Sequence, residues 1–168
     1  MQVEWYGQSA FRLRAGEHTV VIDPFGDMSP LRERGMPFDY PPISIDRADL
    51  VLVTHEHLDP NGIEVVPGEP PVLRSTAGRL QSPIGEVLAV ASEHDAVAGT
   101  ERGPNTIFAF TLDGVVPMHY RTPRIGFLDT ADAFLEGMAD VHPLEEPRFD
   151  TGALAAEPAP LAVVPAAP

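Results

Sequence analysis

Short apolar runs alternate with glycine, proline and charged residues along the first two thirds of the chain. Alternating apolar and polar positions in residues 2–13, a turn at residues 15–17 and an apolar run at residues 19–22 predict an N-terminal β-hairpin. An apolar run also leads directly into Thr54. Further short strands are predicted at residues 72–74, 86–91 and 106–112. The pattern therefore predicts a mixed β-sheet built from many short strands.

Three segments depart from this strand pattern. Residues 24–45 contain five prolines, which predict a long irregular loop that could cover a site as a lid. Residues 131–141 predict an amphipathic helix, because Thr130 can cap its start and apolar side chains recur on one face. Residues 153–168 are rich in alanine and proline and predict an extended tail, in which residues 161–164 could form one short strand. Residues 1–152 are therefore predicted to form a single domain.

Composition limits the compartment and the partners. The chain has 168 residues, of which 43% are apolar, and this is enough for one domain with its own core. The absence of cysteine excludes disulfides and thiolate metal ligands. No apolar run approaches the roughly 20 residues of a membrane span, and a net charge of −14 disfavours nucleic acid. We therefore predict a cytoplasmic protein with no nucleic-acid or membrane partner.

The strand that ends at Thr54 runs straight into a group of metal-binding side chains. His55, His57 and Asp59 follow it at intervals of two residues. In extended backbone, residues at this interval point to the same side. Imidazole nitrogens and carboxylate oxygens are ligands of zinc. The alternative interpretation, a polar loop after a buried strand, does not explain three such side chains on one face.

The chain resembles the metallo-β-lactamase-fold hydrolases, in particular a small branch with a Trp-Tyr-Gly-His-Ser-Ala-like N-terminus. The resemblance extends over nearly the whole chain and rests on the following stretches: residues 3–11 (Val-Glu-Trp-Tyr-Gly-Gln-Ser-Ala-Phe), 21–24 (Val-Ile-Asp-Pro), 54–59 (Thr-His-Glu-His-Leu-Asp), 91–95 (Ala-Ser-Glu-His-Asp) and 116–120 (Val-Pro-Met-His-Tyr). It implies an α/β fold with αββα layers. It also implies metal-dependent hydrolysis of an ester, amide, lactone or phosphodiester.

The resemblance also implies a set of ligands. It places His55, His57 and His94 on one metal ion and assigns Asp59 and His119 to a second. One Zn²⁺ ion is expected, with two as the alternative, and Mn²⁺ or Fe²⁺ could replace zinc. Asp59 could in addition orient a catalytic water or accept its proton.

Two residues outside this ligand set are also of interest. Asp23 and Glu56 are candidates to accept hydrogen bonds from the imidazole N–H groups. For Glu56, a solvated carboxylate is the simpler interpretation. His18 is expected to be exposed and outside the site.

Three departures from the family pattern weaken the expected second metal site. Pro60 and Gln8 stand where the family has histidines. Gly114 runs directly into Val115, so the segment that normally carries a Gly-Asp bridging ligand is predicted to be absent. Hydrolysis is therefore expected to be impaired.

Two other interpretations remain open. One is a non-catalytic, metal-binding or interaction protein descended from the family. The other is the product of a deletion that depends on a partner. A shortened second half would leave an unpaired sheet edge or apolar face near Phe108 and Phe110, which predicts a homo-oligomer.

Overall fold

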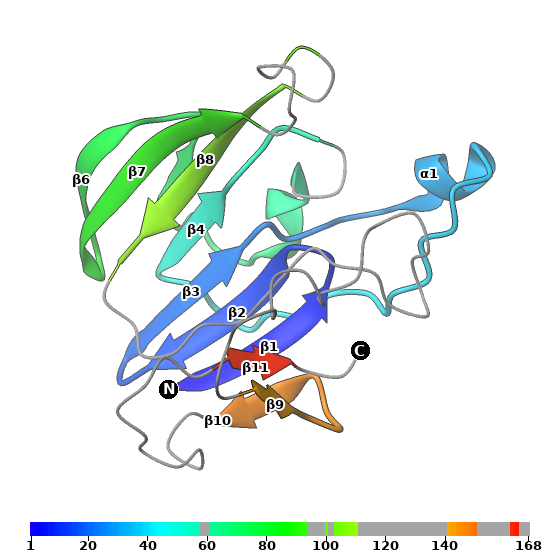
Figure 1. The fold of residues 1–168 in the computed structure, drawn as a ribbon, viewed down its shortest axis with the longest axis horizontal. Helices are drawn as coiled ribbons and strands as arrows, with labels where there is room; N and C mark the ends of the chain where they lie inside the picture. The colour runs from blue at the N-terminus through cyan, green and yellow to red at the C-terminus, as the bar shows by residue number, and fades with distance from the viewer. Residues whose placement is uncertain (58–60, 94–99, 101–102, 111–140, 151–161, 165–168) are drawn as a thin grey trace.

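The computed structural model describes residues 1–57, 61–93, 100, 103–110, 141–150 and 162–164. The strands among these residues form three β-sheets (Figure 1). The largest has the strand order β10-β1-β2-β3-β4-β5, and its strands are β1 (Gln2–Gly7), β2 (Ala10–Ala15), β3 (His18–Ile22), β4 (Leu50–Val53), β5 (Val72–Arg74) and β10 (Arg148–Asp150). A three-stranded sheet contains β6 (Gly78–Ser82), β7 (Gly85–Glu93) and β8 (Pro104–Ala109). The third sheet pairs β9 (Val141–Pro143) with β11 (Ala162–Val164).

The N-terminal strands form an antiparallel meander that continues into parallel strands. In the pairing of β1 with β2, Trp5 lies opposite Phe11, and β2 turns into β3 where Ala15 lies opposite His18. This confirms the predicted turn after Ala15, but residues 2–13 form two strands, β1 and β2, so the N-terminal unit has three strands rather than the two of a hairpin. Strands β3, β4 and β5 then run parallel, with Ile22 opposite Leu52. The first residues after β3 and after β4 therefore lie next to each other, at the carboxyl ends of these two parallel strands.

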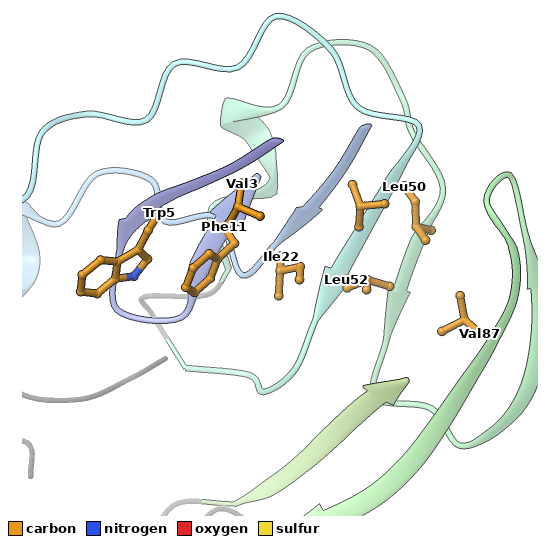
Figure 2. Packing of buried hydrophobic residues seen from close by; sticks show 8 residues of the cluster. Val3, Trp5, Phe11, Ile22, Leu50, Leu52 and Val87 are labelled. Carbon is orange, nitrogen blue, oxygen red and sulfur yellow. The ribbon is translucent and has the colours of Figure 1, made fainter. Parts of the chain in front are cut away.

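Strand β4 is buried on both faces. Leu50 and Leu52 belong to the main core cluster on one face, together with Trp5, Phe11 and Val87 (Figure 2). Val51 and Val53 belong to a separate cluster on the other face, and all four residues of the strand are 0% exposed. A strand buried on both sides is apolar throughout rather than alternating. This accounts for the uninterrupted apolar run before Thr54.

The proline-rich segment at residues 24–45 differs from the prediction in one respect. It contains a short helix, α1 (Ser29–Glu33), with Pro30 in its first turn. Proline is tolerated there because the N–H groups of a first turn have no partner within the helix. The segment is also packed, since Phe25, Phe38 and Tyr40 form a cluster with edge-to-face ring contacts between Phe38 and each of the other two.

The three-stranded sheet carries an exposed apolar surface. Within the described residues β8 lies at the edge of its sheet, as expected. Phe108 and Phe110 themselves are half-buried and pack against the main core. The exposed side chains are Val90 and Ile107, which lie opposite each other on β7 and β8 and are 45% and 53% exposed. Alternation along β8 explains this, because Ile107 points to the opposite face from its phenylalanine neighbour.

The helix predicted at residues 131–141 is wrong at its last residue. Val141 begins strand β9 and lies opposite Ala162 of β11, whereas residues 130–140 lie outside the described part of the chain. Pro143 two residues later disfavours helix at the preceding position, and pairing with β11 supplies hydrogen bonds that a helix end would lack. Strand β11 falls within the short strand predicted at residues 161–164.

The chain that follows the His55–His57 motif is held against the loop after β3. Gly62 N–H donates to the carbonyl of Pro24 over 2.7 Å. A Cβ atom added at Gly62 would meet backbone atoms of Phe25 and Gly26 at 2.3 Å and 2.0 Å. Only glycine allows these two backbones to approach so closely. The loop after β3 therefore fixes the position of Gly62, a few residues after the His55–His57 motif.

No helix within the described residues has both the length and the apolar character that crossing a membrane requires.

Candidate metal centre at the end of strand β4

Two histidines lie together where β4 ends. The ring centroids of His55 and His57 are 4.8 Å apart, and the ring planes are almost perpendicular at 88°. His55 is 3% exposed, whereas His57 is half-buried. The structure thus confirms that the spacing of two residues brings both imidazoles to one side. One ring is held within the protein and the other lies closer to solvent.

A buried carboxylate and a hydroxyl hold His55 in place. Asp23, the first residue after β3, is 1% exposed. Its Oδ1 accepts a hydrogen bond from Thr54 N–H over 2.7 Å, and its Oδ2 accepts one from Thr54 Oγ1 over 2.5 Å. Thr54 Oγ1 in turn lies 2.8 Å from His55 Nδ1. Asp23, Thr54 and His55 form a continuous hydrogen-bonded chain, which we call the Asp23 relay.

The chemistry of the Asp23 relay assigns the tautomer of His55. An ionised carboxylate only accepts hydrogen bonds, and a hydroxyl has a single proton. With Asp23 ionised, the proton of Thr54 Oγ1 goes to Asp23 Oδ2, and His55 Nδ1 is then the donor to Thr54 Oγ1. A neutral imidazole that carries its proton on Nδ1 has its lone pair on Nε2, the arrangement in which a histidine binds a metal through Nε2.

The backbone at Asp23 is adapted to this role. Its φ angle of +43° lies in the left-handed region, which is uncommon for residues other than glycine and is tolerated best by asparagine and aspartate. Asp23 N–H donates to the carbonyl of Leu52 over 2.9 Å, so the turn after β3 is tied to β4. The expectation that Asp23 supports an imidazole is therefore refined: its Oδ2 lies 3.9 Å from His55 Nδ1 and acts through Thr54.

Glu56 forms an ion pair with Arg74 of β5. Arg74 Nε donates to Glu56 Oε1 over 2.9 Å, and Arg74 Nη2 donates to Oε2, which makes the pair bidentate. Ser75 Oγ donates to the same Oε1 over 2.7 Å, and Arg74 Nη2 also reaches Asn61 Oδ1. The hydrogen bonds from Arg74 hold the pKa of Glu56 below its usual value. Glu56 is thus exposed, as the simpler interpretation expected, and its carboxylate is paired with Arg74 and Ser75.

The remaining predicted ligands cannot be compared with the structure. Asp59, His94 and His119 lie outside the described residues, as do Pro60 and the junction at Gly114. Within the described part of the chain, no group of three or more histidine, aspartate or glutamate side chains is placed to hold a metal ion. His18 is exposed, as expected. Gln8 is 3% exposed, and its Oε1 has no hydrogen-bond partner among the described residues.

Strand β8 is the part of the site that the sequence did not indicate. Its residue Asn105 forms an antiparallel bridge with His55, and Thr106 N–H donates to the carbonyl of Thr54 over 2.6 Å. Asn105 Nδ2 also donates to Ser92 Oγ on β7. The three-stranded sheet therefore joins the motif at the end of β4. The polar residues Asn105 and Thr106 at the start of an otherwise apolar strand are the feature of the sequence that could have indicated this contact.

A cavity of about 420 Å³ lies beside His55. Its described walls come from the large sheet and from β7 and β8, and they include Ser9, Thr54, Glu93 and Asn105. The site thus combines two neighbouring imidazoles, one of them fixed by a buried carboxylate, with an adjacent space large enough for a small molecule.

Known proteins resemble this chain in sequence and in fold. The family model of the β-lactamase superfamily domain matches residues 2–128. A UPF0173 metal-dependent hydrolase of Nitratidesulfovibrio vulgaris is 41% identical over 58 residues, which cover 34% of this chain and 22% of that protein. A UPF0173 protein of Pyrococcus abyssi is 29% identical over 62 residues, or 37% of this chain and 24% of that protein. The matched region thus spans less than a quarter of the length of these curated relatives.

The fold comparison extends over the whole chain. A crystal structure of a Thermotoga maritima protein, which is named as a Zn-dependent hydrolase of the metallo-β-lactamase superfamily, superposes with a TM-score of 0.68. The superposition covers 99% of each chain at 18% sequence identity, and it shows the fold. The αββα architecture expected from the sequence is thereby confirmed. Because the family model covers more than half of the residues, this chain belongs to the β-lactamase superfamily, and its fold is the metallo-β-lactamase fold.

Proposed function

We propose that this chain is a metal-dependent hydrolase that holds a zinc ion at the end of β4 and acts on a small molecule in the cytoplasm. The observation that carries the proposal is the Asp23 relay beside the His55–His57 pair. A buried carboxylate that orients an imidazole through a hydroxyl is the kind of support that histidine ligands of metals receive from their surroundings. The matches to metal-dependent hydrolases support the same conclusion.

The residues present suit a divalent metal ion. His55 and His57 offer neutral imidazole nitrogens, which zinc, manganese and iron(II) accept. His94 is proposed as the third ligand of the first ion, and Asp59 and His119 as ligands of a second. When bound, such an ion supplies a Lewis acid that polarises a carbonyl or phosphoryl oxygen and lowers the pKa of water.

The side chains of this chain have separate tasks in the proposal. His55 is held rigidly by the Asp23 relay and fixes the position of the ion, whereas the half-buried His57 completes the pair on the solvent side. The Glu56–Arg74 ion pair ties the residue between them to β5. Asp59 is proposed to orient the attacking water and to accept its proton.

The second candidate function is metal binding without turnover. Pro60 stands where the family pattern has a histidine, and Gly114 runs directly into Val115 without the usual Gly-Asp. A second ion would then keep at most two protein ligands from this chain, fewer than a tightly held site provides. The two functions differ in one readout, since both predict bound metal and only the first predicts hydrolysis.

The first prediction concerns metal content. The purified chain should hold close to one zinc ion, and His57→Ala should lose most of it because the imidazole pair is broken. The matched control is His18→Ala, since His18 is exposed and lies away from the motif. Elemental analysis after dialysis against zinc-containing and chelator-treated buffers measures the content.

Hydrolysis is measured on the same samples with p-nitrophenyl acetate and bis(p-nitrophenyl) phosphate, with and without a chelator. Turnover that the chelator abolishes and zinc restores would establish the enzyme. Metal binding with no turnover of any ester or phosphodiester would favour the non-catalytic candidate. Equal metal content in His57→Ala and in wild type would show that the metal lies elsewhere.

The second prediction concerns the hydroxyl of Thr54. Thr54→Val keeps the size and the β-branching of the side chain but removes the oxygen that joins Asp23 to His55. Zinc affinity should fall about 10- to 100-fold, the usual effect of losing a group that orients a ligand. Thr54→Ser restores the hydroxyl and should restore most of the affinity. Competition with a chromogenic chelator gives both values, and equal affinities for the valine and serine variants would mean that the relay has no role in metal binding.

The third prediction concerns the Glu56–Arg74 ion pair. Arg74→Gln removes the bidentate partner of Glu56, so the segment between the two histidines loses its attachment to β5 and zinc affinity should fall several-fold. Arg79→Gln is the matched control, because Arg79 pairs with Glu86 in an exposed ion pair on the other sheet. If the two variants bind zinc equally well, the position of Glu56 is irrelevant to the site. Circular dichroism melting of both variants reports any general loss of stability.

A further inference from the structure

The cavity beside His55 extends from the motif into the space between the two sheets. Its described walls include Ile22 of β3, Leu52 of β4 and Phe108 of β8. Its volume of about 420 Å³ is within the range of small-molecule sites, which is roughly 300–1,000 Å³. Figure 1 shows β8 running alongside β4 on the side where the two sheets meet.

The pairing of the strands gives the cavity a polar end and an apolar end. Asn105 bridges His55 in antiparallel register, so β8 leaves the motif in the direction opposite to β4. The part of β8 from Asn105 to Phe108 therefore runs in the same direction as the chain read backwards from His55 to Leu52. At roughly 3.3 Å per residue this is a path of about 10 Å.

The walls change in character along this path. Thr54, His55 and Asn105 line the polar end, next to the proposed metal site. The other end is lined by side chains that also contact the main core cluster: Ile22, Leu52, Phe108 and Phe110. Figure 2 shows Ile22 and Leu52 side by side on the face of the large sheet that faces Val87.

The described walls of the cavity carry no positively charged side chain. Among the described residues that line the cavity, Glu93 carries a negative charge and no lysine or arginine is present. The chain as a whole has a net charge of −14. At the apolar end an anionic group would lose its hydration with no cationic side chain among the described walls to pair with it, whereas an uncharged chain would gain from leaving water.

We propose that this cavity binds the acyl chain of an uncharged carboxylic ester, with the ester carbonyl at the His55 end and the hydrocarbon between Leu52 and Phe108. This inference rests on the proposed hydrolase function and names its substrate class. In the reaction, water adds to the carbonyl carbon, the ester C–O bond breaks, and a proton passes to the departing alkoxide, so that the products are an acid and an alcohol.

The first experiment compares p-nitrophenyl acetate, butyrate, hexanoate and octanoate on the zinc-loaded wild-type chain. Each added methylene that enters the cavity should raise kcat/KM by about threefold to fourfold until the cavity is full. The mono-p-nitrophenyl ester of succinic acid, which ends in a carboxylate, should be a much poorer substrate than the butyrate. Equal kcat/KM values for all four neutral esters would overturn the proposal.

Variants at the apolar end should move the preferred length in opposite directions. Ile22→Phe reduces the space and should shift the optimum to shorter chains, whereas Phe108→Leu enlarges the space and should shift it to longer ones. Val90→Phe is the control, since Val90 is 45% exposed and does not line the cavity. Opposite shifts cannot come from general destabilisation. If Ile22→Phe and Phe108→Leu lower all rates without changing the length profile, the acyl chain does not lie there.

A binding measurement separates this inference from the proposed function. The uncharged fluorophore N-phenyl-1-naphthylamine should bind the wild-type chain and Val90→Phe, and its affinity for Ile22→Phe should be at least fivefold lower. If this pattern of affinities is found in a chain that hydrolyses no ester, the cavity is a binding site and the proposed hydrolase function is wrong. Ester hydrolysis with equal fluorophore affinity in wild type and Ile22→Phe would keep the enzyme and overturn the cavity assignment.

Discussion

The carboxylate of Asp23 is the constraint on which the candidate site depends. It accepts both the backbone N–H and the side-chain hydroxyl of Thr54, and it does so with 1% of its surface exposed. A buried charge is costly unless hydrogen bonds satisfy it, and bonds to an ionised group contribute about 1.5–3 kcal/mol each. The two bonds join the ends of β3 and β4. Thr54 also contacts His55. The carboxylate that joins the ends of β3 and β4 therefore also orients the first imidazole of the motif.

The site is therefore held from three directions. The Asp23 relay fixes His55 from β3, the Glu56–Arg74 ion pair fixes the next residue from β5, and β8 bridges His55 from the second sheet. A metal site needs this support because ligands must keep their geometry when the ion is absent or exchanging. These contacts support the first metal position that we propose at His55. In the same proposal, Pro60 and the direct Gly114-Val115 junction weaken a second metal position.

The strands and the histidine pair could be predicted because their signals are local. Alternation of apolar residues located β1 and β2, an apolar run located β3, and a spacing of two residues placed His55 and His57 on one side. Asp23 was predicted as a partner of an imidazole, but its link through Thr54 and the pairing of Glu56 with Arg74 could not be predicted, because they join distant parts of the chain. Asp23 and Thr54 are 31 residues apart, and Glu56 and Arg74 are 18 apart. The spacing within the motif carries no information about which distant side chain each residue meets. For the same reason, β9 at Val141 was mistaken for the end of a helix, since its partner lies in the C-terminal segment.

The tautomer of His55 is the most direct test of this account, because it depends on the Asp23 relay and not on the substrate. Long-range ¹H–¹⁵N correlation spectra of the metal-free chain, labelled at histidine, distinguish a proton on Nδ1 from one on Nε2. The account predicts a neutral His55 with its proton on Nδ1, and partial loss of that preference in Thr54→Val. A wild-type His55 with its proton on Nε2 would contradict the relay, and with it the orientation proposed for the metal ligand.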